Sequence, residues 1–352
     1  MYKSWVDYTP QISVDQDKIR LSMARRLQRR AVVDGTISLP AVPGLTDESV
    51  ETCAAIFASV GCAFSDEQLQ NLRGIIHSQA TIAYEKSPRS NIIIAYNKPI
   101  GTMLNYTVNT QWWSVEEAYN NWVATREPPL FGTEPDARVW ALAGEASNPG
   151  AFAILDIGAG TGRNTLALAR RGHPVDAIEP TSGFAEAIRN DASRELLRVR
   201  VFERNAFTTT DDLRRDYQLI LLSEVVSDFR TTGELRGVCE IAGRTLAPGG
   251  RLVFNIFLPK PGYTRDDAAR ALGEQCYTSI FTREEMATAA AGLGLELVAD
   301  DSVYEYEKAN LPEGAWPPTS WYADWVSGRD TFDLPREDNP IELRWLVYQK
   351  TR

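Results

Sequence analysis

A short apolar run followed by three alternate glycines constrains the fold of this chain most strongly. The run covers residues 154–157, and continuous apolar stretches of this length are typical of buried strands in parallel sheets. After the glycines, residues 165–171 continue without a breaker until Gly172, which predicts a helix that ends at a glycine. We therefore expect a strand, a glycine-rich turn and a helix.

The spacing of the glycines restricts which nucleotide the turn can hold. Glycine has no Cβ, so the backbone of such a turn can approach a ligand closely. A dinucleotide-binding turn needs its third glycine three residues after the second, and Arg163 stands at that position. A second predicted strand ends at Glu179, where nucleoside-binding sheets place the carboxylate that accepts hydrogen bonds from ribose hydroxyls. The pattern favours a nucleoside ligand other than NAD.

The motif around the glycines resembles that of a known enzyme family. Residues 155–162, taken with Glu179, are similar to the first two motifs of the class I S-adenosylmethionine-dependent methyltransferases. The turn at 246–250 is similar to the one that precedes their fifth strand, and the resemblance covers about 151–260. It implies an α/β fold with a doubly wound, mostly parallel, Rossmann-like sheet whose final strand is antiparallel. It also implies S-adenosyl-L-methionine (SAM) as the cofactor and S-adenosyl-L-homocysteine (SAH) as its product.

The resemblance implies a set of cofactor-binding residues as well. In this family the aspartate and the glycines face the methionine part of SAM, the strand-end acid holds both ribose hydroxyls, and the residue after the third strand helps to hold adenine. That last residue is usually an acid, but this chain has Asn205, whose amide can still bond the adenine amino group. The implied residues are Asp156, Gly158, Ala159, Gly160, Gly162, Asn164, Glu179, Pro180, Asn205, Ala206 and Ser223.

The turn after the predicted fourth strand, 217–222, carries candidate catalytic carboxylates. Side chains that follow this strand lie over the ligand crevice of a doubly wound sheet, and Glu224 and Asp228 are among them. Related enzymes often have a histidine where Asp228 stands. The two acids are candidates for a general base, or they cap the next helix. Tyr106 is a further candidate base.

Two regions are expected along the chain. Residues 131–352 should form the SAM-binding domain, and residues 1–130 a mainly helical N-terminal cap that builds part of the substrate pocket. In the cap we expect a helix opened by a capping box at Ser13, helices at 47–60 and 65–84, a loop at 34–45 and a hairpin over 91–108.

A segment rich in tryptophan and proline, at about 305–340, is predicted to form a lid over the pocket. Its aromatic side chains could stack on a planar substrate or stabilise the sulfonium of SAM. Alternatively, they fill the gap between the lid and the domain.

Composition limits the partners. The net charge of −10 argues against nucleic acid and anionic membranes, because both require a basic surface. The one strongly basic segment, 18–30, is either a clamp for an anionic substrate or a solvated helix face. With two histidines and no closely spaced cysteine pair, we expect no metal site. No signal peptide and no long apolar run is apparent, so we expect a cytoplasmic protein, with a homodimer through the N-terminal region as one expected assembly.

The sequence therefore predicts a methyltransferase that acts on a small organic molecule, of the kind made in specialised (natural-product) metabolism, with a carboxylate base. Two alternatives stay open. One is a peptide or protein methyltransferase, and the other is a SAM-binding regulator without catalysis.

Overall fold

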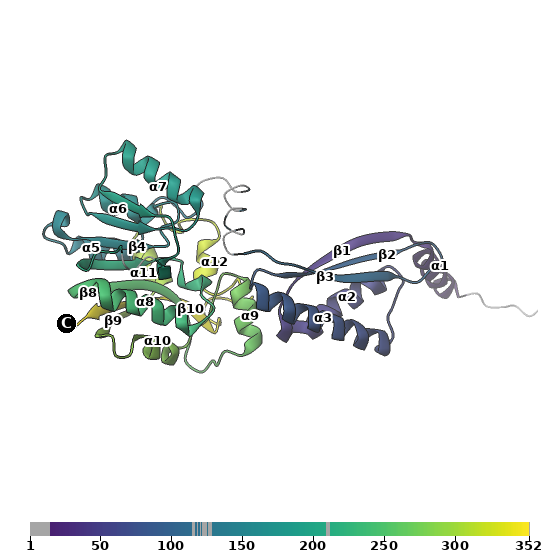
Figure 1. Cartoon of the computed structure of the whole chain (residues 1–352). Coiled ribbons are helices and arrows are strands. Elements are labelled where there is room, and N and C mark those ends of the chain that lie inside the picture. Colours follow the sequence, from purple (N-terminus) through teal and green to yellow (C-terminus); the bar gives the residue numbers. More distant parts are fainter. Residues whose placement is uncertain are drawn as a thin grey trace, which may run out of the picture. The chain divides into compact units, whose positions relative to one another are not determined.

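The protein is described by a computed structural model that covers residues 15–114, 117, 119, 121, 125, 129–208 and 212–351 (Figure 1). The chain divides into two compact units. Unit 1 is Met1–Ala83 with Asn91–Gln111, and unit 2 is Tyr84–Ser90 with Trp112–Arg352. By this division residues 112–130, which we expected in the N-terminal region, belong to unit 2.

Unit 1 combines helices with a three-stranded antiparallel sheet of order β1-β2-β3. Its apolar core lies between the sheet and two of the helices and includes Phe57, Ile76 and Ile94. The predicted hairpin is confirmed as β2 and β3. The elements are α1 (Gln16–Arg30), β1 (Val33–Pro40), η1 (Pro43–Leu45), α2 (Thr46–Ser59), α3 (Asp66–Lys86), β2 (Asn91–Lys98) and β3 (Asn105–Gln111).

The strand β1 corrects our expectation of a loop at 34–45. Aspartate, glycine and proline are depleted in strands, and β1 contains one of each. Only Ile37 of β1 is fully buried, so the strand depends on pairing with β2 and not on its own apolar pattern. Gly35 is required in this pairing, because a Cβ there would lie 2.6 Å from the hydroxyl of Tyr96. The capping box expected at Ser13 lies outside the described residues, and Asp15 caps α1.

Unit 2 contains the expected doubly wound sheet. Its seven strands have the order β6-β5-β4-β7-β8-β10-β9, and β10 is antiparallel to both of its neighbours. The prediction of a mostly parallel sheet with an antiparallel final strand is confirmed. The strands are β4 (Ile154–Ile157), β5 (Val175–Ile178), β6 (Val199–Phe202), β7 (Tyr217–Leu222), β8 (Leu246–Pro259), β9 (Leu295–Ser302) and β10 (Ile341–Lys350).

Apolar side chains alternate between the two faces of this sheet. Ile220 and Leu222 pack on one face against α8 and α10, whereas Leu219 and Leu221 pack on the other against α5, α6 and α12. The helices and short 3-10 turns of unit 2 are α5 (Ala137–Gly144), η2 (Pro149–Ala151), α6 (Arg163–Arg170), α7 (Ser182–Arg194), η3 (Ala206–Thr208), η4 (Val226–Asp228), α8 (Thr232–Thr245), α9 (Asp267–Gln275), α10 (Arg283–Ala290), α11 (Val303–Asn310) and α12 (Tyr322–Val326).

The tryptophan-rich segment packs as core, which corrects the prediction of a lid at 305–340. Tyr322 and Trp325 in α12 are 1% and 4% exposed. The ring of Trp325 lies 5.3 Å from that of Phe257 in β8, and its Nε1 donates to the carbonyl oxygen of Tyr277 at 2.9 Å. Trp316 and Trp321 pack against the same cluster. The aromatic residues therefore cover one face of the sheet.

Within the described parts of the chain, no helix has both the length and the apolar character needed to cross a bilayer.

Candidate active site

A cavity of about 580 Å³ opens at the carboxyl ends of β4, β5 and β7. The strand order reverses between β4 and β7, and a doubly wound sheet binds its ligand at such a switch point. Most of the predicted site residues line this cavity. They are Asp156, Gly158, Ala159, Gly160, Asn164, Glu179, Pro180, Asn205, Ala206, Ser223, Glu224 and Asp228.

The glycine turn after β4 needs its glycines for different reasons. All three have positive φ, at 72°, 54° and 87° for Gly158, Gly160 and Gly162. A Cβ at Gly158 would overlap Val225, and one at Gly162 would lie 2.9 Å from Ile188. Gly162 does not line the cavity and serves the packing of α6 on α7. A Cβ at Gly160 would have its nearest neighbour 3.6 Å away, on the ring of Phe131, so this glycine faces open space in the cavity.

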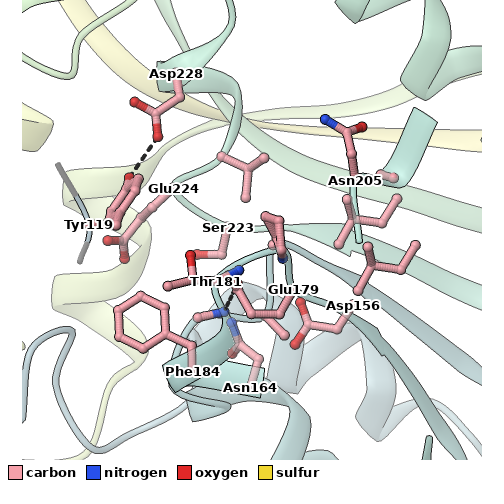
Figure 2. A pocket seen from close by; sticks show the side chains of 18 of the residues that line it. Tyr119, Asp156, Asn164, Glu179, Thr181, Phe184, Asn205, Ser223, Glu224 and Asp228 are labelled. Atoms are coloured by element: carbon pink, nitrogen blue, oxygen red, sulfur yellow. Dashed lines mark hydrogen bonds between the residues drawn. The ribbon is translucent and has the colours of Figure 1, made fainter. Parts of the chain in front are cut away.

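Glu179 holds the turn and also faces the cavity. Its Oε2 accepts a hydrogen bond from the backbone N–H of Gly160 at 2.8 Å, and its Oε1 accepts one from that of Thr181 at 2.8 Å (Figure 2). Burial raises the pKa of Glu179, and these two backbone donors oppose the rise. A carboxylate oxygen can accept more than one hydrogen bond, so Glu179 can bind ligand hydroxyls while it holds the turn.

Asp156 and Asn164 form hydrogen bonds to residues on either side of the turn in sequence. The Oδ2 of Asp156 accepts from the hydroxyl of Thr165 at 2.6 Å, and burial raises the pKa of Asp156 to about 7. Asn164 bonds Asp136 twice, through Oδ1 to its backbone N–H at 2.9 Å and through Nδ2 to its carboxylate at 2.8 Å. Asn205 lies across the cavity from Glu224 and Tyr119 (Figure 2), which fits binding at opposite ends of a long ligand.

Comparison with known proteins agrees with this geometry. A family model described as "Methyltransferase domain" matches residues 154–250, which contain the turn, Glu179 and the strands that flank the cavity. Residues 154–250 of unit 2 are therefore part of a methyltransferase domain. The side chains around the turn suit SAM, because Glu179 offers acceptors for ribose hydroxyls and Gly160 leaves room beside it.

Several solved structures are similar to this chain at low identity. Geranyl diphosphate C-methyltransferase from Streptomyces coelicolor A3(2) is 16% identical, with a TM-score of 0.46 over 61% of this chain and 78% of that one. A structure of geranyl diphosphate methyltransferase in complex with SAM is 18% identical, with a TM-score of 0.48 over 61% and 85%. A protein from Galdieria sulphuraria, assigned as a sarcosine dimethylglycine methyltransferase, is 15% identical, with a TM-score of 0.48 over 67% and 98%. No curated protein matches the sequence.

In the methyltransferase domain, Arg163 joins two acids beside the cavity. Its Nη1 donates to Asp136 at 2.8 Å and its Nη2 to Glu224 at 2.8 Å. Glu224 has a positive φ of 61°, and its backbone N–H donates to Asn255 at 2.8 Å. Burial raises the pKa of Glu224 to about 7, and Arg163 opposes the rise. Sequence reasoning missed Asp136, Asn255 and the role of Arg163, which immediately follows the glycines.

Asp228 lies at the same end of the cavity. One carboxylate oxygen accepts from Arg89, and the other accepts from the hydroxyl of Tyr119 at 2.6 Å. The alternative role of Asp228 and Glu224, capping of the next helix, is not observed. Thr231 and Glu234 form the capping box of α8 instead.

Tyr106, the third candidate base, is not among the residues that line this cavity. It lies on β3 in the core of unit 1, with its ring 6.1 Å from Phe57 and 5.9 Å from Phe64. Burial raises the pKa of Tyr106, so a smaller fraction of it is ionised near neutral pH than of an exposed tyrosine. The tyrosine that lines the cavity is Tyr119. Among the described residues, no group of three or more acidic, histidine or cysteine side chains is placed to hold a metal ion.

Proposed function

We propose that this domain methylates a small organic molecule, of the kind made in specialised metabolism, with Glu224 as the general base. The observation that carries the proposal is that one cavity contains both the donor turn and a pair of partly buried carboxylates, Glu224 and Asp228, whose side chains are 12% and 15% exposed. Its volume of about 580 Å³ is in the range of pockets that enclose small ligands.

Aromatic side chains form the wall beside the carboxylates. The ring of Phe184 lies 6.5 Å from that of Tyr119 and 5.9 Å from that of Phe131, both in edge-on contacts. Such a wall suits an apolar or planar acceptor, which gains from burial and from contact with the rings. Glu224 lines the same cavity as these rings and can offer its carboxylate to a polar group on the acceptor.

Methyl transfer requires that the acceptor is aligned with the methyl group and that a base takes up the acceptor's proton. When bound, SAM supplies a methyl group on a positively charged sulfur, and a hydroxyl acceptor that takes this methyl in line loses its proton to give a neutral ether. Glu224 suits that proton because its pKa is raised to about 7, near the pH at which the enzyme would work. One of its oxygens pairs with Arg163, and among the described residues the other has no hydrogen-bond partner. In contrast, both oxygens of Asp228 are occupied.

The test is methyl transfer from radiolabelled SAM to a panel of small phenols, alcohols and amines. We expect labelled product from at least one of them. Transfer to peptides alone would favour the peptide alternative, and SAH binding without any transfer would favour the regulator. Several expectations stay predictions. They are that the protein is cytoplasmic, that it avoids nucleic acid and membranes, that unit 1 helps to choose the substrate, and that the protein dimerises through the N-terminal region.

A further inference from the structure

Arg89 is a buried arginine near the acceptor end of the cavity, although it does not line the cavity. It belongs to the short segment Tyr84–Ser90 of unit 2, far in sequence from the other site residues. Its side chain is 6% exposed. The guanidinium donates to the carbonyl oxygen of Glu274 and to Oδ1 of Asp228, and its Cζ lies 3.5 Å from the ring centroid of Tyr277.

Asp228 connects Arg89 to the cavity wall. Its side chain is 15% exposed and lines the cavity. Its Oδ2 accepts from the hydroxyl of Tyr119, which also lines the cavity (Figure 2). The three side chains therefore form one chain of contacts, in which a carboxylate accepts from a cation on one side and from a phenol on the other.

Whether Asp228 is ionised decides which side chain donates the hydrogen bond between Asp228 and Tyr119. Burial raises the pKa of Asp228, and Arg89 and Tyr119 lower it. A buried acid that loses its cationic partner takes up a proton readily. Once protonated, Asp228 could donate to the oxygen of Tyr119, whereas the ionised form can only accept. Burial raises the pKa of Tyr119 well above that of a free tyrosine, so the phenol keeps its own proton.

We propose that Arg89 is a positioning residue of the acceptor site. It keeps Asp228 ionised, so that the hydroxyl hydrogen of Tyr119 points at Asp228 and the phenol oxygen offers a lone pair to the acceptor. The acceptor is then a molecule with an O–H or N–H group at or beside the atom that is methylated. This inference rests on the proposed function.

The test compares Arg89→Met, Arg89→Lys, Asp228→Asn and the double variant Arg89→Met/Asp228→Asn with wild type. Arg230→Met is the matched control, because Arg230 bonds the same segment through the carbonyl of Tyr84 at 2.9 Å and pairs with Glu274 but not with Asp228. The readout is kcat/KM as a function of pH, with the best acceptor from the panel. A lysine has one ammonium group and cannot bridge Glu274 and Asp228 as a guanidinium does, so Arg89→Lys should recover only part of the rate.

We expect Arg89→Met to lower kcat/KM at least tenfold and to add a pH-dependent limb that wild type lacks, with the rate rising as Asp228 loses its proton. That limb should be absent from Asp228→Asn and from the double variant, and Arg230→Met should follow the wild-type profile. A profile for Arg89→Met that superimposes on wild type, or a matching loss in Arg230→Met, would overturn the proposal.

A second measurement needs no acceptor and separates this inference from the proposed function. In Arg89→Met the unpaired Asp228 should bind a proton in the folded state at a pH where the unfolded chain has lost it. The stability of Arg89→Met should therefore fall more steeply with rising pH than that of wild type, Asp228→Asn or the double variant. Equal slopes for all of them would overturn the inference even if an acceptor were found.

Discussion

Gly160 is the glycine of the donor turn at which a side chain would enter the cavity without a clash with neighbouring side chains. We expect Gly160→Val to lower the affinity for SAH at least tenfold, because the valine would stand beside Phe131 in the space for the ligand. The positive φ of 54° adds backbone strain, which should lower stability by about 1 kcal/mol. Calorimetric titration with SAH measures the affinity.

Gly183→Val is the matched control, because nothing lies within 4 Å of a Cβ at that position in α7. This variant should bind SAH as wild type does. If Gly160→Val also bound SAH normally while folded, the turn would not be the donor site.

Glu224 is the residue on which the proton transfer depends. Glu224→Gln should reduce kcat by about 10²- to 10⁴-fold, the range for loss of a general base, with little change in SAH affinity. In wild type the carboxylate form is gained as pH rises through about 7, so kcat/KM should rise with pH up to that value. Glu240→Gln is a control on the exposed face of α8, where Glu240 pairs with Arg236. An unchanged rate in Glu224→Gln would leave Glu224 as a partner of Arg163 only.

Residues within one local motif could be predicted, and residues brought in from elsewhere could not. Asp156 and Glu179 follow from the strand ends and the glycines, because the strand, turn and helix fix their places. Asp136, Arg89 and Asn255 reach the site from segments far away in sequence, and no local pattern marks them. Tyr119 shows the same limit, since it precedes the motif and only the tertiary fold brings it to the cavity.

At the scale of elements, the central strands of unit 2 could be predicted to within a few residues. A strand buried on both faces is apolar throughout, so β4 and β7 stand out in the sequence. The strand β1 has no such pattern and exists through its pairing with β2. The prolines and tryptophans of the segment 305–340 predict a lid, but the sheet face on which the aromatic rings pack decides where they lie.

A variant in α12 tests whether the segment 305–340 is core or a lid. Trp325→Ala should lower the free energy of unfolding by about 3–5 kcal/mol, because it removes a buried ring and its hydrogen bond to Tyr277. Denaturant unfolding measures the loss, and SAH affinity of the folded variant should not change. A lid would give the opposite result, with normal stability and weaker binding.

At the scale of the whole molecule, folding stability depends on buried acids beside the cavity. Burial raises the pKa of Asp156 to about 7, whereas the unfolded chain releases this proton near its ordinary value of 3.8. Between these values the folded state binds more protons, so the contribution of Asp156 to stability is lost as pH rises.

Asp156→Asn tests this dependence because asparagine cannot ionise. Relative to wild type, the variant should gain about 2 kcal/mol of stability between pH 5.5 and pH 8.5, since one pKa unit corresponds to about 1.4 kcal/mol. Chemical unfolding at both pH values, without ligand, gives the difference. A constant difference between the two proteins would mean that Asp156 is ionised in the folded state throughout this range.

The crystal structure of the protein with SAH tests the central claim most directly. We expect the ribose hydroxyls to bond Glu179, the adenine to lie toward Asn205, and the sulfur to face the space lined by Tyr119, Glu224 and Asp228. A ligand bound elsewhere, or a ribose with no contact to Glu179, would contradict it.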